Sequence, residues 1–146
     1  ARALLAAGLL EPAMAEVRRA AVAGADAGEA ALLSAELFLR QGLGGEALER
    51  FDAALARLNG ERGAAHALAA LGRARALLQL ERLPEADAAV GRLAAARPRD
   101  VEVLRLAGEL RLRQADAPAA LQAFGEARAL APDDARLQRA YAQAAW

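Results

Sequence analysis

The sequence predicts an all-α protein, a stack of antiparallel helix pairs, and three observations carry this prediction. The first is the spacing Ala120-x3-Phe124-x2-Ala127-x4-Pro132, which recurs 34 residues upstream. The second is a composition rich in Ala, Leu, Arg and Glu, all of which have high helix propensity. The third is the recurrence of Pro and Gly where helices have to end. A repeat of this length indicates a stack of similar units rather than one globular core.

The repeated spacing occurs four times along the chain. The copy 34 residues upstream of the first has Ala86, Val90, Leu93 and Pro98 at the four positions. Two earlier copies have the first three positions, as Ala47, Phe51 and Ala54 and as Ala13, Val17 and Ala20. The phase is unbroken from residue 1 to about 61, slips by five residues at 62–66, and continues to the end. The slip predicts an insertion, either as extra helix or as a longer loop.

The helices expected from this phase span 1–7, 11–23, 28–41, 45–58, 63–80, 84–96, 101–114, 118–130 and 135–146. Prolines suit the first turn of a helix, where their missing N–H costs little, so Pro12, Pro84 and Pro118 mark second helices. Proline cannot continue a helix, so Pro98 and Pro132 follow helix ends, and Asn59-Gly60 takes that role in the earlier unit.

The acidic residues before the later first helices have a structural interpretation. Asp100 and the pair Asp133-Asp134 are placed to cap the helices that begin at 101 and 135 and to favour their dipoles. The tight turns within the units are Gly42-Leu43-Gly44-Gly45, Arg82-Leu83-Pro84 and Ala115-Asp116-Ala117-Pro118. Each unit is therefore expected to be a helix, a short turn and a second helix.

These spacings resemble the tetratricopeptide repeat (TPR), a 34-residue helix pair. The best unit, 101–134, has Leu104, Ala107-Gly108, Ala120, Phe124, Ala127 and Pro132 at the family's positions. The resemblance implies a single TPR-like α-solenoid over 1–146, a right-handed superhelical stack of antiparallel helix pairs. Its parts are a partial repeat 1–27, repeats 28–61, 67–100 and 101–134, and a terminal helix 135–146, with the insertion at 62–66. The departures are the absent early Trp, Ser34 and Arg73 at apolar positions, and Arg111 in place of Tyr. The chain is expected to be a fragment of a longer bacterial TPR protein.

Composition excludes several kinds of function. The formal net charge is zero, with 19 basic and 19 acidic residues, which argues against a general nucleic-acid or anionic-membrane surface. There is no Cys and no apolar run approaching the ~20 residues needed to span a bilayer. Every basic side chain is Arg, which is typical of a GC-rich coding sequence. The compartment is not indicated; bacterial cytoplasm and periplasm both stay open.

No constellation of residues predicts chemistry, so no catalytic, cofactor or metal site is expected. His66 is the only His and Ser34 the only Ser, and neither has an evident partner. The Gly42-to-Gly45 turn lacks the Lys and the preceding strand of a phosphate loop. Asp133 and Asp134 are adjacent, which suits capping better than a paired acid and base.

The resemblance implies a partner-binding groove, because TPR first helices line the concave face of the stack. Helical spacing selects the residues of that face. The expected partner-binding residues are Glu36, Leu39, Arg40, Arg75, Leu78, Gln79, Arg105, Glu109, Leu112, Arg113, Arg136 and Arg139. Leu39, Leu78 and Leu112 would form an exposed apolar strip, unless side chains of neighbouring helices cover it. The Glu and Arg residues could equally be solvated helix-face pairs.

Two charge patterns refine the expected partner. Chaperone-binding TPRs grip a C-terminal carboxylate with Lys, Asn and Arg, but the matching positions here hold Leu32, Glu36, Leu68 and Gly72. A chaperone-tail role is therefore rejected. An anionic partner could instead meet a basic patch of Arg105, Arg113, Arg136 and Arg139.

The expected function is a non-catalytic scaffold that binds a peptide or partner domain in the concave groove, as part of bacterial envelope assembly such as polysaccharide export, pilus assembly or secretion. No nucleic acid, no direct membrane insertion and no cofactor is expected. Two alternatives stay open: a self-association module that stacks through exposed repeat ends into a homo-oligomer, and a recruiting arm of an enzyme whose catalytic domain lies outside this segment.

Overall fold

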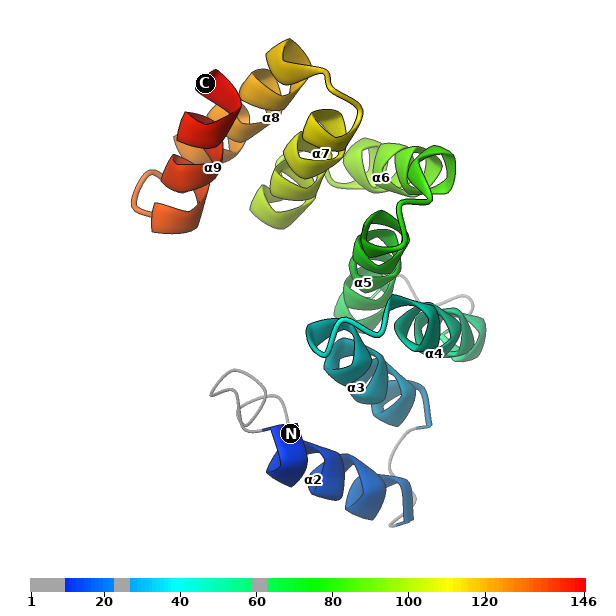
Figure 1. The fold of residues 1–146 in the computed structure, drawn as a ribbon. Coiled ribbons are helices and arrows are strands. Elements are labelled where there is room, and N and C mark those ends of the chain that lie inside the picture. The colour runs from blue at the N-terminus through cyan, green and yellow to red at the C-terminus, as the bar shows by residue number, and fades with distance from the viewer. Residues whose placement is uncertain (1–9, 23–26, 59–62) are drawn as a thin grey trace. The chain divides into compact units, whose positions relative to one another are not determined.

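A computed structural model describes residues 10–22, 27–58 and 63–146 as helices joined by short connections, with no strand among them (Figure 1). The helices are α2 (Leu10–Val22), α3 (Ala27–Arg40), α4 (Gly44–Arg57), α5 (Ala64–Gln79), α6 (Leu83–Ala96), α7 (Val101–Arg113), α8 (Ala117–Leu130) and α9 (Ala135–Ala145). The chain divides into two compact units, Ala1–Leu80 and Glu81–Trp146. We call them unit 1 and unit 2.

The helix positions predicted from the repeat phase are confirmed. Every observed end of α2 to α9 lies within one residue of the prediction. The predicted helix 1–7 and the Asn59-Gly60 turn lie outside the described residues. Of the insertion at 62–66, Gly63 is the N-cap of α5 and residues 64–66 form its first turn, so most of the inserted chain lengthens this helix.

The core of unit 1 forms where α4 packs between α3 and α5. Ala47, Phe51 and Ala54, the repeated positions of α4, are all fully buried. Phe51 lies against the backbone of α5 at Gly72, where the position of a Cβ would fall inside the van der Waals radius of the ring. A glycine in this helix therefore provides the socket for the aromatic ring.

Unit 2 uses the same positions with a different partner for its aromatic ring. Ala120, Phe124 and Ala127 of α8 are fully buried, as in α4. Here the ring of Phe124 lies against Gly108 of α7, where an added Cβ would be 2.6 Å from Phe124 Cε1. The ring also clusters with Ala144 of α9. The hairpin α7–α8 thus holds both the ring and its socket.

Aspartates cap three of the helices in unit 2. Asp100 Oδ1 accepts hydrogen bonds from the backbone N–H groups of Glu102 and Val103, at 2.9 and 3.3 Å. Asp134 Oδ1 accepts from the N–H of Arg136 at 2.9 Å. These two caps confirm the prediction, and Asp116 adds a third at the start of α8, accepting from Ala119 N–H at 3.1 Å.

The turns inside the three helix pairs share one backbone feature. The second residue after the first helix has a positive φ in each case: 79° at Gly42, 57° at Glu81 and 60° at Ala115. These residues occupy the same position of units 28–61, 67–100 and 101–134. Only Gly42 is a glycine, so the left-handed conformation is imposed on two side chains that disfavour it.

Replacing Ala115 by glycine is therefore expected to stabilise the protein. Relief of the left-handed strain should raise the free energy of unfolding by about 0.5–1 kcal/mol, since glycine adopts this conformation without a Cβ penalty. The reverse change, Gly42→Ala, is expected to lower it by about 1 kcal/mol. Urea denaturation followed by circular dichroism measures both. Equal stability of the Ala115→Gly variant and the wild type would contradict the strain.

Candidate functional site

The predicted groove residues of unit 1 lie on α3 and α5. The C-terminal ends of these two helices lie close together, as the 3.5 Å hydrogen bond from Gln79 Nε2 to the carbonyl of Leu39 shows. Arg40 and Gln79 are exposed, while Glu36, Leu39 and Arg75 are half-buried. Leu78 is buried, with 5% of its surface exposed.

The expectation that Leu78 belongs to an exposed apolar strip is therefore wrong. Leu32, at a position that matches the carboxylate clamp of chaperone-binding TPRs, is also fully buried. The reason is that α5 packs against both α3 and α4, so more of each first helix is covered than the spacing of one helix indicates. In unit 2, Leu112 does remain exposed, with 37% of its surface accessible.

The basic patch predicted in unit 2 is neutralised by acidic neighbours. Arg105 lies between Glu102, at 2.9 Å, and Glu109. Arg113 pairs with Glu81, and Arg136 pairs with Asp134 at 3.1 Å and Glu102 at 3.6 Å. The fourth member, Arg139, donates to the backbone carbonyl of Ala135. Three of the four arginines thus have a carboxylate partner, which offsets much of the positive charge of the predicted patch.

The pair of Asp134 and Arg136 predicts a lowered pKa for the Asp134 carboxyl group, which can be measured. Hydrogen bonds from the Arg136 side chain and then from the Arg136 backbone N–H lower the pKa of Asp134 below its ordinary value of 3.8. A lowered pKa means that the stabilising contribution is complete above about pH 3.8 and is lost as pH falls through the lowered value. We expect a carboxyl titration by NMR to give a midpoint below 3.8 for Asp134, and Arg136→Ala to move it upward. An unchanged midpoint in that variant would contradict the assigned cause.

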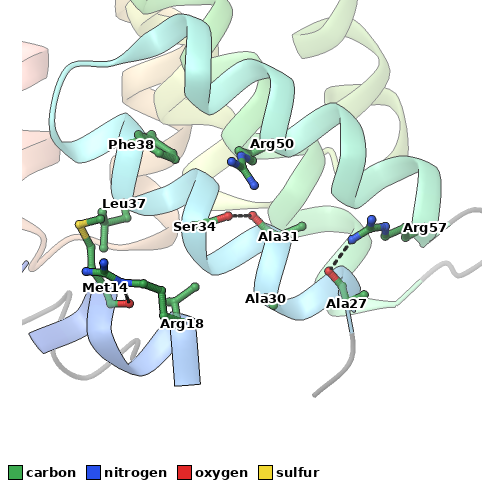
Figure 2. A pocket seen from close by; sticks show the side chains of 11 residues that line it. Met14, Arg18, Ala27, Ala30, Ala31, Ser34, Leu37, Phe38, Arg50 and Arg57 are labelled. Carbon is green, nitrogen blue, oxygen red and sulfur yellow. Dashed lines mark hydrogen bonds between the residues drawn. The ribbon is translucent and has the colours of Figure 1, made fainter. Parts of the chain in front are cut away.

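A pocket of about 400 Å³ lies between α2, α3 and α4 in unit 1 (Figure 2). It was not predicted from the sequence. Its described lining is apolar except for one hydroxyl and three guanidinium groups. The lining residues are Met14, Val17, Arg18, Ala27, Ala30, Ala31, Ser34, Leu37, Phe38, Arg50 and Arg57.

The three arginines approach this pocket from two helices. Arg50 and Arg57 reach from α4 toward α3, and Arg18 faces α3 from α2 (Figure 2). The guanidinium carbon of Arg50 lies 5.9 Å from the centre of the Phe38 ring, within the range of a cation–π contact. Arg57 Nη1 donates to the carbonyl of Ala27 at 3.2 Å. Among the described residues no carboxylate pairs with any of these three side chains.

A comparison of repeat positions explains why the pocket escaped prediction. Ala30 occupies the position that Val103 has in unit 101–134, and Val103 is buried with 2% of its surface exposed. Arg50 and Arg57 occupy the positions of Ala123 and Leu130. The sequence signal for the pocket is thus a smaller side chain and two added charges in repeat 28–61 relative to repeat 101–134. This signal becomes visible only when the repeats are aligned with one another.

The described residues show no arrangement typical of an active site. No group of three or more His, Asp or Glu side chains that could hold a metal ion occurs among them. Ser34 Oγ donates to the carbonyl of Ala31 at 2.8 Å, as in many helices, and has no basic partner. His66 is half-buried in the first turn of α5.

Comparison with known proteins places this architecture. A thermophilic TPR protein of Thermus thermophilus superimposes with a TM-score of 0.80 at 22% identity, over 99% of this chain and 77% of its own. The chain therefore has a TPR-like fold. The MamA RS-1 ArsTM double mutant is similar as well, with a TM-score of 0.73 at 18% identity, over 98% and 78% of the two chains. No family model and no curated protein matches the sequence.

In TPR-like terms, α3, α5 and α7 are first helices and α4, α6 and α8 are second helices. The predicted groove residues lie on first helices and on α9, whereas the pocket of unit 1 uses a different face of α3 together with two second helices. The TPR-like fold therefore presents two separate candidate surfaces. Within the described part of the chain, no helix combines the length and apolar character that a bilayer span requires.

Proposed function

We propose that this chain is a non-catalytic protein-interaction scaffold that holds a peptide or partner domain against the exposed face of its first helices. The observation that carries the proposal is the TPR-like helix-pair architecture, in which the repeated positions Ala47, Phe51, Ala120 and Phe124 are used entirely for packing. Stacked helix pairs leave extended surfaces that suit binding. Exposed Leu112 and the charged side chains around it supply the contacts in unit 2.

The proposal includes a cellular setting, assembly of a bacterial envelope structure such as polysaccharide export, pilus or secretion machinery. It is supported by the arginine-only basic composition, typical of GC-rich bacterial genes, and by analogy with the fold. Identification of captured partners by mass spectrometry tests this setting. Partners drawn only from cytosolic metabolism would contradict it.

Two leucines of equal exposure allow a matched test of the first-helix face. Leu112 on α7 and Leu130 on α8 each expose 37% of their surface, but only Leu112 lies on a first helix. We expect Leu112→Glu to reduce partner capture by about tenfold or more, because it places an unpaired charge in an apolar contact. Leu130→Glu should leave capture unchanged.

The measurement is affinity capture with quantitative mass spectrometry, comparing the two variants with the wild type. Circular dichroism checks that both variants fold, and light scattering checks that the bait is monomeric, so that self-association does not imitate binding. Equal loss in both variants, or no loss in either, would contradict the assignment of the first-helix face.

A further inference from the structure

We propose that the pocket between α2, α3 and α4 binds an acidic–aliphatic peptide segment of a partner protein, with a carboxylate held by the arginines and an aliphatic side chain inserted below them. This inference rests on the proposed scaffold function and gives it a second, chemically defined subsite. It uses a different face of α3 from the one that carries Glu36, Leu39 and Arg40.

The size and lining of the pocket suit one or two peptide side chains. Its volume of about 400 Å³ lies in the ordinary range for ligand sites, ~300–1,000 Å³. Met14, Val17 and Leu37 supply apolar surface from α2 and α3. Met fills irregular space and adapts to different partners, so its position at the rim favours an aliphatic guest.

The charge around the pocket selects an acidic guest. Arg18, Arg50 and Arg57 line it, no acidic residue is among its described lining, and none of the three has a carboxylate partner in the described chain. In unit 2, by contrast, Arg105, Arg113 and Arg136 are paired with Glu or Asp.

The donors of Arg50 and Arg57 are not exhausted by their contacts within the protein. A guanidinium group has five N–H donors, and among the described residues Arg57 donates one hydrogen bond, to the carbonyl of Ala27. The cation–π contact with the Phe38 ring uses the face of the Arg50 guanidinium group rather than its N–H donors. Because Arg binds carboxylates through two parallel hydrogen bonds, these side chains fit an Asp or Glu side chain.

Comparison of the repeats shows that the two arginines are specific to repeat 28–61, since repeat 67–100 has Ala89 and Ala96 at their positions. The equivalent positions in unit 101–134 carry Val103, Ala123 and Leu130, where the pocket has Ala30, Arg50 and Arg57. Packing alone is satisfied by the apolar set, since Val103 is buried. Ala69 of repeat 67–100 is as small as Ala30 and is fully buried. The pair of arginines beside the small side chain is therefore what distinguishes the pocket.

The test uses two substitutions that act on different properties of the pocket. Arg50→Glu reverses the charge, and Ala30→Leu fills the space while leaving the charge unchanged. The matched control is Arg92→Glu, an exposed arginine of α6 that changes the net charge by the same amount. The probe is a set of short fluorescein-labelled peptides in a Gly/Ser background, each with one Leu and one Glu at varied separation. Matched peptides carry Gln for Glu or Ser for Leu.

Fluorescence polarisation should show saturable binding of a Leu/Glu peptide to the full chain. Replacing Glu by Gln in the peptide should weaken binding by about tenfold or more, the loss expected for a charge-assisted hydrogen bond. Arg50→Glu and Ala30→Leu should each weaken it to a similar extent, and Arg92→Glu should not. Raising the salt concentration should weaken binding, because the arginines lie at the rim where charge is screened.

Several results would overturn the proposal: no binding by any Leu/Glu peptide, equal binding of the Gln peptides, or wild-type binding by both pocket variants. If circular dichroism shows that Ala30→Leu does not fold, Arg50→Gln and Arg57→Gln carry the test, since both side chains lie at the surface. The scaffold proposal is judged separately by capture with Leu112→Glu. Loss of capture in that variant together with unaltered peptide binding in Arg50→Glu would remove the subsite and keep the scaffold.

Discussion

Replacing Phe124 by alanine is expected to lower the free energy of unfolding by about 3–5 kcal/mol, the range observed for fully buried aromatic residues. The ring is fully buried between Gly108 of α7 and Ala144 of α9. Its removal leaves a cavity that the neighbouring backbone cannot fill, since both neighbours already lack a bulky side chain. The loss therefore combines lost hydrophobic transfer and an open cavity.

Urea denaturation followed by circular dichroism measures this loss, with the slope checked so that a change in the unfolded state is recognised. Phe124→Leu is the graded control, because it retains most of the apolar volume and should cost less. Leu130→Ala, on the exposed side of the same helix, should change stability by well under the loss for Phe124→Ala. A loss below about 1 kcal/mol for Phe124→Ala would contradict the burial of the ring.

Replacing Gly72 by alanine is expected to destabilise unit 1 although alanine is the better helix former. Overpacking costs about 1–3 kcal/mol, against a propensity gain of about 1 kcal/mol. The added Cβ would overlap the ring of Phe51, which is itself fully buried and has no space to move into. The steric cost of the added methyl group should therefore exceed the gain in helix propensity.

A double-mutant cycle with Phe51→Leu tests whether the ring causes the loss. In the Phe51→Leu background, Gly72→Ala should cost much less or become stabilising, because the smaller side chain leaves room for the methyl group. Gly91→Ala is the matched control, since nothing lies within 4 Å of its added Cβ and the helix propensity alone should stabilise it. Additive losses for Gly72→Ala and Phe51→Leu would contradict a direct contact.

The helices were predictable from the sequence because the repeat phase constrains all of them together. Prolines and capping aspartates placed the ends of α6 to α9. The exposure of single residues was less predictable. Leu78 has the spacing of an exposed residue, but its burial depends on contacts of α5 with two other helices, which a pattern within one helix does not contain.

The pairs of Arg105 with Glu102 and Glu109 have the helical spacing that the sequence shows, but the pairs of Arg111 and Arg113 and the pocket were hidden, for related reasons. Arg113 pairs with Glu81, and Arg111 with Asp87, across turns and between helices, so helical spacing of three and four does not connect them. The pocket depends on side chains that are too small to fill their positions. A side chain that is smaller than its position allows does not form a sequence motif. It becomes apparent only when Ala30 is compared with Val103 at the same position of another repeat.

The two glycine sockets have a consequence for rearranging the repeats. Phe124 finds Gly108 inside its own hairpin, whereas Phe51 depends on Gly72, which belongs to the hairpin that follows. A piece of chain spanning 101–134 therefore carries its principal aromatic contact with it when it is grafted, duplicated or shuffled. A piece spanning 28–61 is an incomplete building block, because its ring fits only a neighbour that offers a glycine at the matching place.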